Sequence, residues 1–361
     1  MNFDTGYDKI LEKIALVDPI KYADSRNFIN GSVTYLSPYI SRGVISTHQV
    51  LASVLASGYE PTKIEKFIQE LAWRDYWQQV WISNKSKIDE DLRQTQPGAL
   101  KIGIPQNILT HQTGIEAIDN GIQSFYKTGY LHNHVRMYVA SLVCNIAKCH
   151  WKVPAHWMYY HLLDADWASN ALSWQWVCGS NSHKLYFANQ ENINKYCHTN
   201  QHGTFLDIAY DAFTDIEIPK ILNTVSTPFF KTTLPPTNVP VLEPNLPTLV
   251  YNFYNLDPNW RRDMKANRIL LFEPSVFANY PVSEKSINFC LALARDNIPG
   301  VKIWVAEFYE LQKFVRGEIY FKEHPLNNYE GFEDPRTWMT GIKGDHPSFF
   351  NFWKKCKKEL F

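Results

Sequence analysis

The chain lacks several features that would place it in a common class of protein. No apolar stretch approaches the roughly 18 residues that a membrane-spanning helix needs, and the N-terminus has no basic patch followed by an apolar run. Six cysteines show no Cys-x-x-Cys spacing, which argues against zinc or an iron–sulfur cluster. We therefore expect a soluble, cytoplasmic protein with reduced cysteines, no membrane contact and no metal.

An excess of charge of either sign is also missing. Lysine plus arginine and aspartate plus glutamate both number 36, so the formal net charge is zero. Global charge therefore cannot be the main force that holds this protein on duplex DNA, although a local basic patch remains open. At 361 residues the chain is long enough for two folded units.

Tryptophan, by contrast, is abundant and clustered. Eight of the twelve tryptophans lie between Trp73 and Trp176. The segment Asp164–Trp176 combines two acids, the amide of Asn170 and three tryptophans in a mostly small and apolar stretch. Burying unpaired carboxylates is costly, and an exposed surface seldom gathers three tryptophans. The segment therefore predicts a concave site for a large aromatic ligand with one polar edge.

Helical spacing dominates from about residue 38 to residue 180. After Pro61, which suits a first helical position, apolar residues recur at helical intervals. A second face of the same helix carries Glu70, Trp73, Arg74 and Trp77. This face predicts a recognition surface, and the alternative is a surface salt bridge between Glu70 and Arg74 beside two half-buried tryptophans. A further helix is expected from near Tyr130 to about Cys149.

The later part of the chain follows a different pattern. Seven prolines between Pro219 and Pro247 predict an extended linker. Beyond them, a strand at 268–272, a helix at 283–295 and a strand at 301–306 predict one β-α-β unit, without a Gly-x-Gly-x-x-Gly or P-loop phosphate site. The expected fold is mainly α, with a helical domain over 1–215, a linker over 216–248 and a small α/β unit over 249–361.

Four motifs between about residues 20 and 185 carry a resemblance. They are Leu36-Ser-Pro-Tyr-Ile, Glu70-Leu-Ala-Trp-Arg-Asp-Tyr, Thr128-Gly-Tyr-Leu-His-Asn-His-Val-Arg-Met and the Asp164–Trp176 segment. In order and spacing they resemble the FAD-binding helical domain of the DNA photolyase/cryptochrome family. The resemblance implies FAD as the cofactor and a short form without the family's N-terminal α/β antenna domain, which would then absorb blue light through the flavin chromophore alone.

The resemblance also implies which residues bind FAD. Tyr22 and the loop of Val33, Thr34, Tyr35, Leu36 and Ser37 match the segment that meets the pyrophosphate. This loop departs from the usual Thr-Ser-Arg-Leu-Ser, losing one hydroxyl and one cation, so phosphate binding is expected to be weaker. An ordinary helix cap at Ser37 is the alternative for the loop.

Other matches surround the flavin ring. Arg136 and Asp164 resemble the family's buried ion pair beside the isoalloxazine, with Ala165 following and Asp166 toward the ribityl chain. Asn170 matches the asparagine that faces the flavin N5, a choice more typical of photolyases than of light-sensing cryptochromes. Arg74 is expected at the boundary between flavin and substrate.

Tryptophans in the same region match an electron-transfer chain. Trp174 corresponds to its inner member and Trp151 to its middle member, although simple core packing is an alternative for Trp151. No tryptophan lies between Leu92 and Ile118, where the outer member is expected. Photoreduction is therefore expected to be slow or to use another donor.

The substrate-side residues resemble those of photolyases that act on cyclobutane pyrimidine dimers. Those enzymes line the lesion cavity with the residue types found here at Glu70, Trp73, Asn133, Met137 and Trp176, whereas (6-4) photolyases have histidines at the positions of Asn133 and Met137. His134 replaces the usual arginine, which weakens phosphate contact. The resemblance therefore implies a light-driven DNA repair lyase that prefers single-stranded or distorted DNA.

Two other functions stay open at this point. The altered phosphate loop and the missing outer tryptophan would suit a cryptochrome-like blue-light sensor without repair activity. A degenerate scaffold that lacks flavin is the third, and the intact Arg136, Asp164, Asp166 and Asn170 argue against it.

Overall fold

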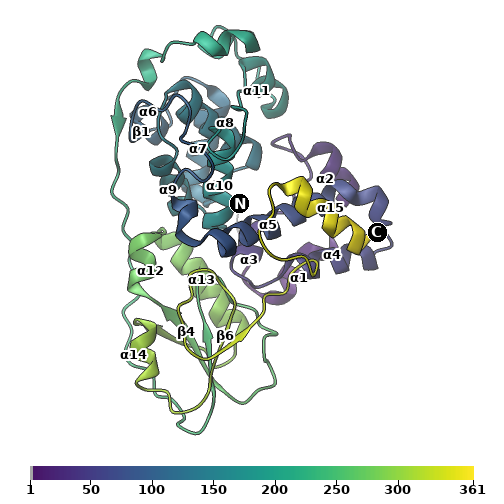
Figure 1. Ribbon diagram of the computed structural model, residues 1–361, viewed down its shortest axis with the longest axis vertical. Helices are drawn as coiled ribbons and strands as arrows, with labels where there is room; N and C mark the ends of the chain where they lie inside the picture. The colour runs from purple at the N-terminus through teal and green to yellow at the C-terminus, as the bar shows by residue number, and fades with distance from the viewer. Residues whose placement is uncertain (1–2) are drawn as a thin grey trace.

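The computed structural model describes residues 3–361 and shows helices in two groups, followed by a small sheet (Figure 1). The first group comprises α1 (Tyr7–Ala15), α2 (Pro19–Ser25), α3 (Ser37–Ser41), α4 (Thr47–Ala56) and α5 (Glu65–Asn84). The second comprises α6 (Gln106–Leu109), α7 (Glu116–Thr128), α8 (Asn133–Ser141), α9 (Lys152–His161), α10 (Trp167–Val177) and α11 (Gln190–Cys197).

The long helix α5 joins the two groups. One of its sides packs on α10 and another on α4 and α2. The expected helix start at Pro61 is wrong by one turn, because Pro61–Ile64 forms a 3-10 turn and the α-helix begins at Glu65. Such tight turns are frequent at helix N-termini, where backbone N–H groups lack helical partners. The helix expected to reach Cys149 also ends early, since α8 gives way to a π-helical turn over Leu142–Ile146.

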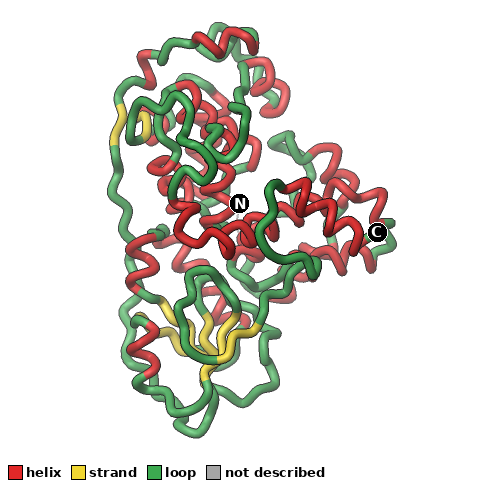
Figure 2. Tube along the Cα trace, in the orientation of Figure 1, coloured by secondary structure: helices red, strands yellow, loops and turns green. Residues whose placement is uncertain are grey.

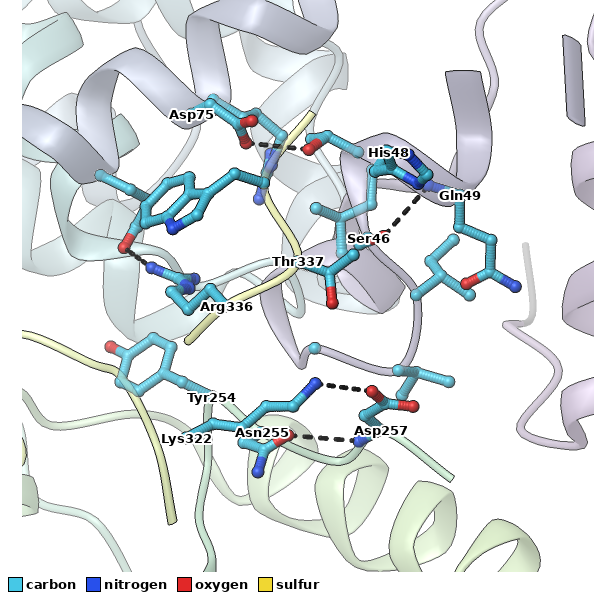
Figure 3. Close-up of a pocket in the computed structure, with 18 of the residues that line it drawn as sticks. Ser46, His48, Gln49, Asp75, Tyr254, Asn255, Asp257, Lys322, Arg336 and Thr337 are labelled. Atoms are coloured by element: carbon cyan, nitrogen blue, oxygen red, sulfur yellow. Dashed lines mark hydrogen bonds and ion pairs between the residues drawn. The ribbon is translucent and has the colours of Figure 1, made fainter. Parts of the chain in front are cut away.

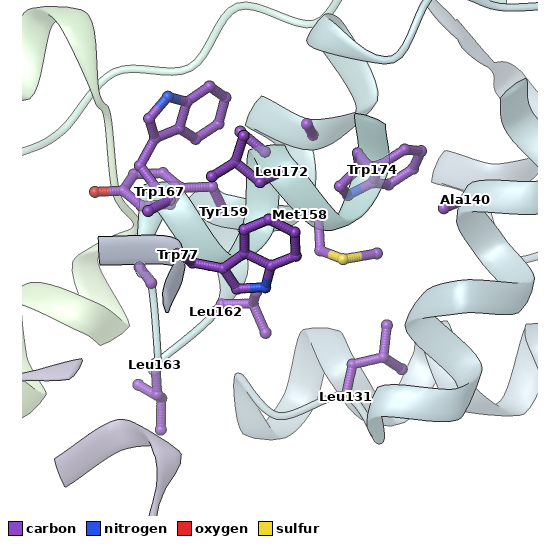
Figure 4. Close-up of a cluster of buried hydrophobic side chains, with 14 of the residues drawn as sticks. Trp77, Leu131, Ala140, Met158, Tyr159, Leu162, Leu163, Trp167, Leu172 and Trp174 are labelled. Carbon is purple, nitrogen blue, oxygen red and sulfur yellow. The ribbon is translucent and has the colours of Figure 1, made fainter. Parts of the chain in front are cut away.

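Tryptophans form much of the core between these helices. Trp81, Trp151, Trp157 and Trp167 are almost fully buried. Figure 4 shows one part of this core, in which side chains of α5, α9 and α10 converge: Trp77, Met158, Tyr159, Trp167, Leu172 and Trp174. Because large rings bury much apolar area each, this clustering holds α5 and α10 at fixed relative positions.

A segment with little regular structure leads away from the helices. Between α11 and the sheet, only two 3-10 turns and the two-residue strand β2 (Val225–Ser226) interrupt an extended path, and β2 pairs with β1 (Ile104–Pro105). Figure 1 shows this path along the edge of the molecule that joins the helical groups to the sheet. Proline restricts the backbone dihedral φ and removes an N–H donor, which explains the extended form.

The sheet holds five parallel strands in the order β5-β4-β3-β6-β7. They are β3 (Thr248–Tyr251), β4 (Asn267–Phe272), β5 (Lys302–Val305), β6 (Ile319–Lys322) and β7 (Phe332–Asp334), with α12 (Pro274–Asn279), α13 (Glu284–Asn297) and α14 (Phe308–Gln312) between them. The expected β-α-β unit is confirmed as β4-α13-β5. Strands β3, β6 and β7 were not expected, because runs of three or four residues give little periodic signal.

The last helix, α15 (Phe349–Leu360), returns from the sheet to the first helical group and packs on α5. Trp353 Nε1 donates to Glu65 at 3.3 Å, and Lys357 Nζ lies 2.7 Å from the same carboxylate. Figure 2 shows the larger sheet confined to one end of a mainly helical chain. The predicted fold class, mainly α with a small α/β unit, is therefore confirmed. Among residues 3–361, no helix combines the length and apolar character that crossing a membrane requires.

Candidate functional site

Arg136 and Asp164 form an ion pair where α8 approaches the start of α10. Arg136 Nη2 lies 3.1 Å from both carboxylate oxygens, and its Nε donates to the Leu131 carbonyl at 2.8 Å. The Asp164 side chain is 5% exposed. Burial raises the pKa of this carboxyl, but the guanidiniums of Arg136 and Arg74 outweigh that effect, so the pKa lies below its ordinary value. The pair is thus charged at neutral pH.

Arg74 of α5 belongs to the same cluster. Its guanidinium donates to the Ser41 hydroxyl, which in turn donates to the Asp164 backbone carbonyl at 3.1 Å. The alternative pairing of Arg74 with Glu70 is not formed, since Glu70 contacts Lys66 at 3.0 Å and Arg26 at 3.4 Å. Two cations therefore lie near the buried Asp164.

Asp166 and Asn170 open and line the first turns of α10. Asp166 is the N-cap residue and accepts from the Ser169 N–H at 2.9 Å, while its second oxygen accepts from Gln78 Nε2 at 2.7 Å. Asn170 is buried and donates to the Ala155 carbonyl at 2.8 Å. The helix start therefore fixes both side chains, with Ala165 buried between the two acids.

The loop expected to meet the pyrophosphate lies beside this ion pair. Tyr35 has a φ of 54°, a left-handed conformation that is unfavourable for a bulky residue. Its ring packs against Tyr130 at 5.1 Å, and Tyr130 neighbours both Arg136 and Asp164. The Ser37 side chain contributes to the lowered pKa of the Asp164 carboxyl. Helix α3 begins at Ser37, and Leu36 precedes it without a side-chain cap bond, so Ser37 does not cap this helix.

Tyr22 lies at a different edge of the cluster. Its ring packs edge-on against Phe67 at 5.2 Å, and burial raises its pKa, as does the nearby carboxylate of Glu70. Val33 and Thr34 are half-buried in the loop. Tyr22 therefore lies close to the substrate-side residue Glu70 as well as to the loop's neighbour Tyr130.

The donors present fit FAD. Ser169 Oγ and His132 Nε2 are buried without hydrogen-bond partners, next to Asn170 and Asn133 respectively. Burial lowers the pKa of His132 to about 4, and its Nδ1 accepts from the His134 N–H, so the unpartnered nitrogen carries a proton. Such groups suit a ligand with hydrogen-bonding edges. A cation pair, hydroxyls and a strained loop around one carboxylate are compatible with a flavin and a pyrophosphate.

A cavity of about 330 Å³ reaches this cluster from the sheet (Figure 3). Arg74, Asp75, Gln78 and Asp166 line it from the helical side. Residues after the carboxyl ends of β3, β6 and β7 line the other side, among them Tyr254, Asn255, Asp257, Glu323, His324 and Arg336. Ligands of parallel sheets commonly bind at this end of the strands.

Arg336 connects the two sides of the cavity. Its guanidinium donates to Gln78 Oε1, and Gln78 Nε2 donates to Asp166. Beside it, Asp75 accepts from Thr47 at 2.9 Å and from the Met339 N–H at 2.8 Å, and burial raises its pKa to about 6. Gln78 could have been predicted as a site residue, because it lies four residues after Arg74 on the same face of α5. Arg336 lies in no motif, so nothing in the sequence indicated it.

The substrate-side residues lie on three helices. On α5, Glu70 is partly exposed and the Trp73 ring stacks on Phe349 of α15 at 3.7 Å and 9°. On α8, Asn133 is exposed and Met137 half-buried. Trp176 at the end of α10 is 41% exposed and has Tyr186 as a ring neighbour at 6.1 Å. In the described part of the chain, no ring pair joins Trp73 to Trp176.

His134, which stands where the family usually has an arginine, is held by contacts within the protein. Its Nδ1 lies 2.8 Å from the Asn27 carbonyl oxygen, and its ring stacks on Tyr138 at 4.7 Å. Burial lowers its pKa. His134 is therefore neutral at physiological pH and does not replace the charge of an arginine.

The buried tryptophans form a ring pair that was not expected. Trp151 lies 6.4 Å from Trp167, and their indole N–H groups donate to Asp91 at 2.7 Å and Asp89 at 2.6 Å. Within residues 3–361, Trp174 is buried but shares no ring pair with Trp151. Trp167 lies inside the Asp164–Trp176 segment, but nothing in the sequence distinguished it from a tryptophan that only packs in the core.

Comparisons with known proteins match the helical part of this chain. A family model described as the FAD binding domain of DNA photolyase matches residues 67–209. A deoxyribodipyrimidine photo-lyase of Alkalihalophilus pseudofirmus is 27% identical over 192 residues, covering 51% of this chain and 40% of the relative. A cryptochrome DASH of Ostreococcus tauri is 30% identical over 185 residues, covering 48% and 33%. The chain thus spans less than half the length of these relatives.

Solved structures align with only part of this chain. A cryptochrome of Synechocystis aligns with a TM-score of 0.48 at 22% identity, covering 54% of this chain and 44% of that one. A class III photolyase of Agrobacterium tumefaciens aligns with a TM-score of 0.45 at 20% identity, covering 60% and 52%.

Residues 67–209, which hold Arg74, Arg136, Asp164, Asp166 and Asn170, thus form a flavin-binding domain whose cofactor is FAD. This domain is similar to the FAD-binding domain of DNA photolyases, and the relatives named above are a photolyase and a cryptochrome DASH.

Proposed function

We propose that the protein repairs cyclobutane pyrimidine dimers in DNA, driven by light and by electron transfer from reduced FAD. One observation carries the proposal. Helix α5 presents Glu70 and Trp73 within one turn of Arg74, and Arg74 reaches Asp164 through Ser41. Residues that suit a lesion and residues that suit a flavin therefore meet on one rigid helix.

The cofactor supplies the light absorption and the electron, and the protein supplies position and charge. Arg136, held by Asp164 and the Leu131 carbonyl, would provide a fixed cation that balances the negative charge of a reduced flavin. Asn170 presents an amide that can donate or accept but cannot act as an acid. Ser37 and the strained loop at Tyr35 would hold the phosphates of the bound cofactor.

The lesion is recognised by rings and one carboxylate. Trp73 and Trp176 offer flat apolar surfaces for a flipped dimer, with Asn133 and Met137 on α8 completing the wall. Glu70 accepts a hydrogen bond from an N–H at the pyrimidine edge and so fixes the position of the dimer relative to the electron donor. Phe349 stacks on one face of Trp73 and Trp77 lies 5.0 Å away, so the dimer contacts the part of the indole that these rings leave exposed.

Single-stranded or distorted DNA is the preferred form of the substrate. Flipping a lesion from an intact duplex costs unstacking energy, and phosphate contacts usually offset it. Here His134 is neutral and held by Asn27, and the formal net charge is zero. The chain therefore has fewer favourable phosphate contacts to offset the free energy of opening a duplex.

A blue-light sensor is the second candidate, and one observation favours it. The Arg336–Gln78–Asp166 chain connects the sheet to the flavin-binding domain. A change of charge on the flavin would alter this contact and so could be transmitted to the sheet. The exposed Trp176 and Asn133 have no role in such a sensor, which is why repair is preferred.

Glu70→Gln tests the repair site against a matched control. We expect this variant to keep FAD and to repair dimers about tenfold more slowly, because it weakens one hydrogen bond to a charged group. Glu60→Gln is the control, since Glu60 also pairs with a nearby lysine, Lys63, at 3.0 Å but lies outside the site. Equal repair rates in both variants, measured per bound flavin under blue light, would remove Glu70 from the proposed site.

A further inference from the structure

Helix α15 carries a concentration of positive charge that is unusual for this neutral chain. Lys354, Lys355, Lys357 and Lys358 occur within five residues. Lys357 pairs with Glu65. The other three lysines are exposed and, in the described part of the chain, form no ion pair. Three free ammonium groups on one helix make a compact basic surface.

The opposite side of α15 is fully engaged. Phe349, Phe352, Trp353 and Cys356 are buried, and Phe352 packs against Tyr76 of α5 at 5.7 Å. A basic amphipathic helix that binds membranes inserts its apolar side into lipid. Because α5 already covers that side, α15 can offer a partner little beyond its lysines and the exposed Phe350. This arrangement favours a soluble polyanion over a lipid surface.

The helix that carries the basic surface packs on the proposed lesion site. Phe349, the first residue of α15, stacks on Trp73, while Trp353 and Lys357 reach Glu65, two turns earlier on α5. The two helices therefore run antiparallel. Lys354, Lys355 and Lys358 follow Phe349 along the helix, within about 14 Å of axial rise from the residue that supports Trp73.

We propose that α15 is the surface that holds the DNA backbone while Trp73 and Glu70 engage the lesion. The three free lysines contact phosphates of the strand that carries the lesion, and Phe349 fixes the orientation of Trp73 relative to them. This inference rests on the proposed function, because it assigns the phosphate contacts of the same substrate. It also gives the local basic patch that a chain with zero net charge requires to bind a polyanion.

Salt dependence of binding tests this directly. The full-length, FAD-bound protein is titrated with a fluorescent single-stranded oligonucleotide at several salt concentrations. We expect the triple variant Lys354→Gln, Lys355→Gln, Lys358→Gln to bind more weakly and to lower the slope of log K against log salt by about 2, because each phosphate contact contributes about 0.7 on single strands. The matched control replaces three exposed lysines of the linker and the α/β unit: Lys231, Lys265 and Lys313.

An unchanged slope in the α15 variant, or an equal loss in the control variant, would overturn the proposal. Binding to vesicles of anionic lipid that depends on the same three lysines and exceeds binding to the oligonucleotide would also overturn it. Failure of the proposed function is distinguishable. Suppose that the wild-type protein shows no light-dependent repair, while the α15 variant still binds the oligonucleotide with a lower salt dependence than the wild type. This result would reject the repair activity but keep α15 as a nucleic-acid contact.

Discussion

Arg136→Ala is expected to yield a protein that is purified without FAD and is less stable by about 3–5 kcal/mol, because removing one partner of a buried ion pair leaves the other charge unpaired. The Asp164 side chain is 5% exposed and that of Arg136 21% exposed, so solvent cannot replace the lost contact fully. Flavin absorbance per chain and the free energy of unfolding in urea measure the two effects.

The same variant has a predictable pH dependence. In the native protein the lowered pKa of Asp164 stabilises the fold above the pKa of the unfolded carboxyl, about 4, and this contribution is lost as the pH falls toward the folded pKa. Without Arg136, only Arg74 and Ser37 still oppose the effect of burial on the pKa of Asp164, so the stabilising contribution of this group is expected to shrink.

Arg261→Ala is the matched control for this experiment. Arg261 forms a second arginine–aspartate pair, with Asp334 at 2.6 Å, on the sheet and away from the flavin-binding domain. Its loss is expected to leave FAD bound. Retention of FAD by Arg136→Ala with unchanged stability would contradict the assignment of the ion pair.

Trp174→Phe is expected to abolish the fast phase of flavin photoreduction while FAD stays bound. Trp174 is buried on α10, one turn after Asn170, and phenylalanine fills most of its volume but is much harder to oxidise. Flavin absorbance after a blue-light flash, in the presence of an external reductant, follows the reaction.

Two further variants complete this test. Trp304→Phe replaces a buried tryptophan of β5 and is expected to leave the rate of flavin photoreduction unchanged. Trp167→Phe asks whether the Trp151–Trp167 pair is part of the path, since these rings lie 6.4 Å apart. Photoreduction that is fast in Trp174→Phe and slow in Trp167→Phe would mean that electrons reach the flavin through the unexpected ring.

The sequence predicted the helical part of the fold well because its signals are local. Residues with strong helical spacing, such as Phe67, Ile68 and Leu71, lie on a buried side of α5. The family motifs also predicted that Arg136 and Asp164 would meet, although 28 residues separate them. In both cases the signal lies within a single helix or a specific motif.

Contacts between distant segments could not be predicted in this way. Phe349 stacks on Trp73, and Arg336 joins Gln78, across more than 250 residues of sequence. Neither Phe349 nor Arg336 lies in a motif, and α15 by itself is indistinguishable from a helix of the α/β unit. The return of this helix to α5 is a tertiary outcome, stabilised by burial of its aromatic side against Tyr76.

The most direct test of the account is repair by the native protein. The purified, FAD-bound protein is reduced, mixed with an oligonucleotide that contains a thymine dimer, and kept either in blue light or in the dark, while absorbance of the intact pyrimidine bases is followed. We predict recovery only in the light, and faster recovery on the single strand than on the duplex. No recovery in the light from a protein with bound, reduced FAD would contradict the account and favour the sensor.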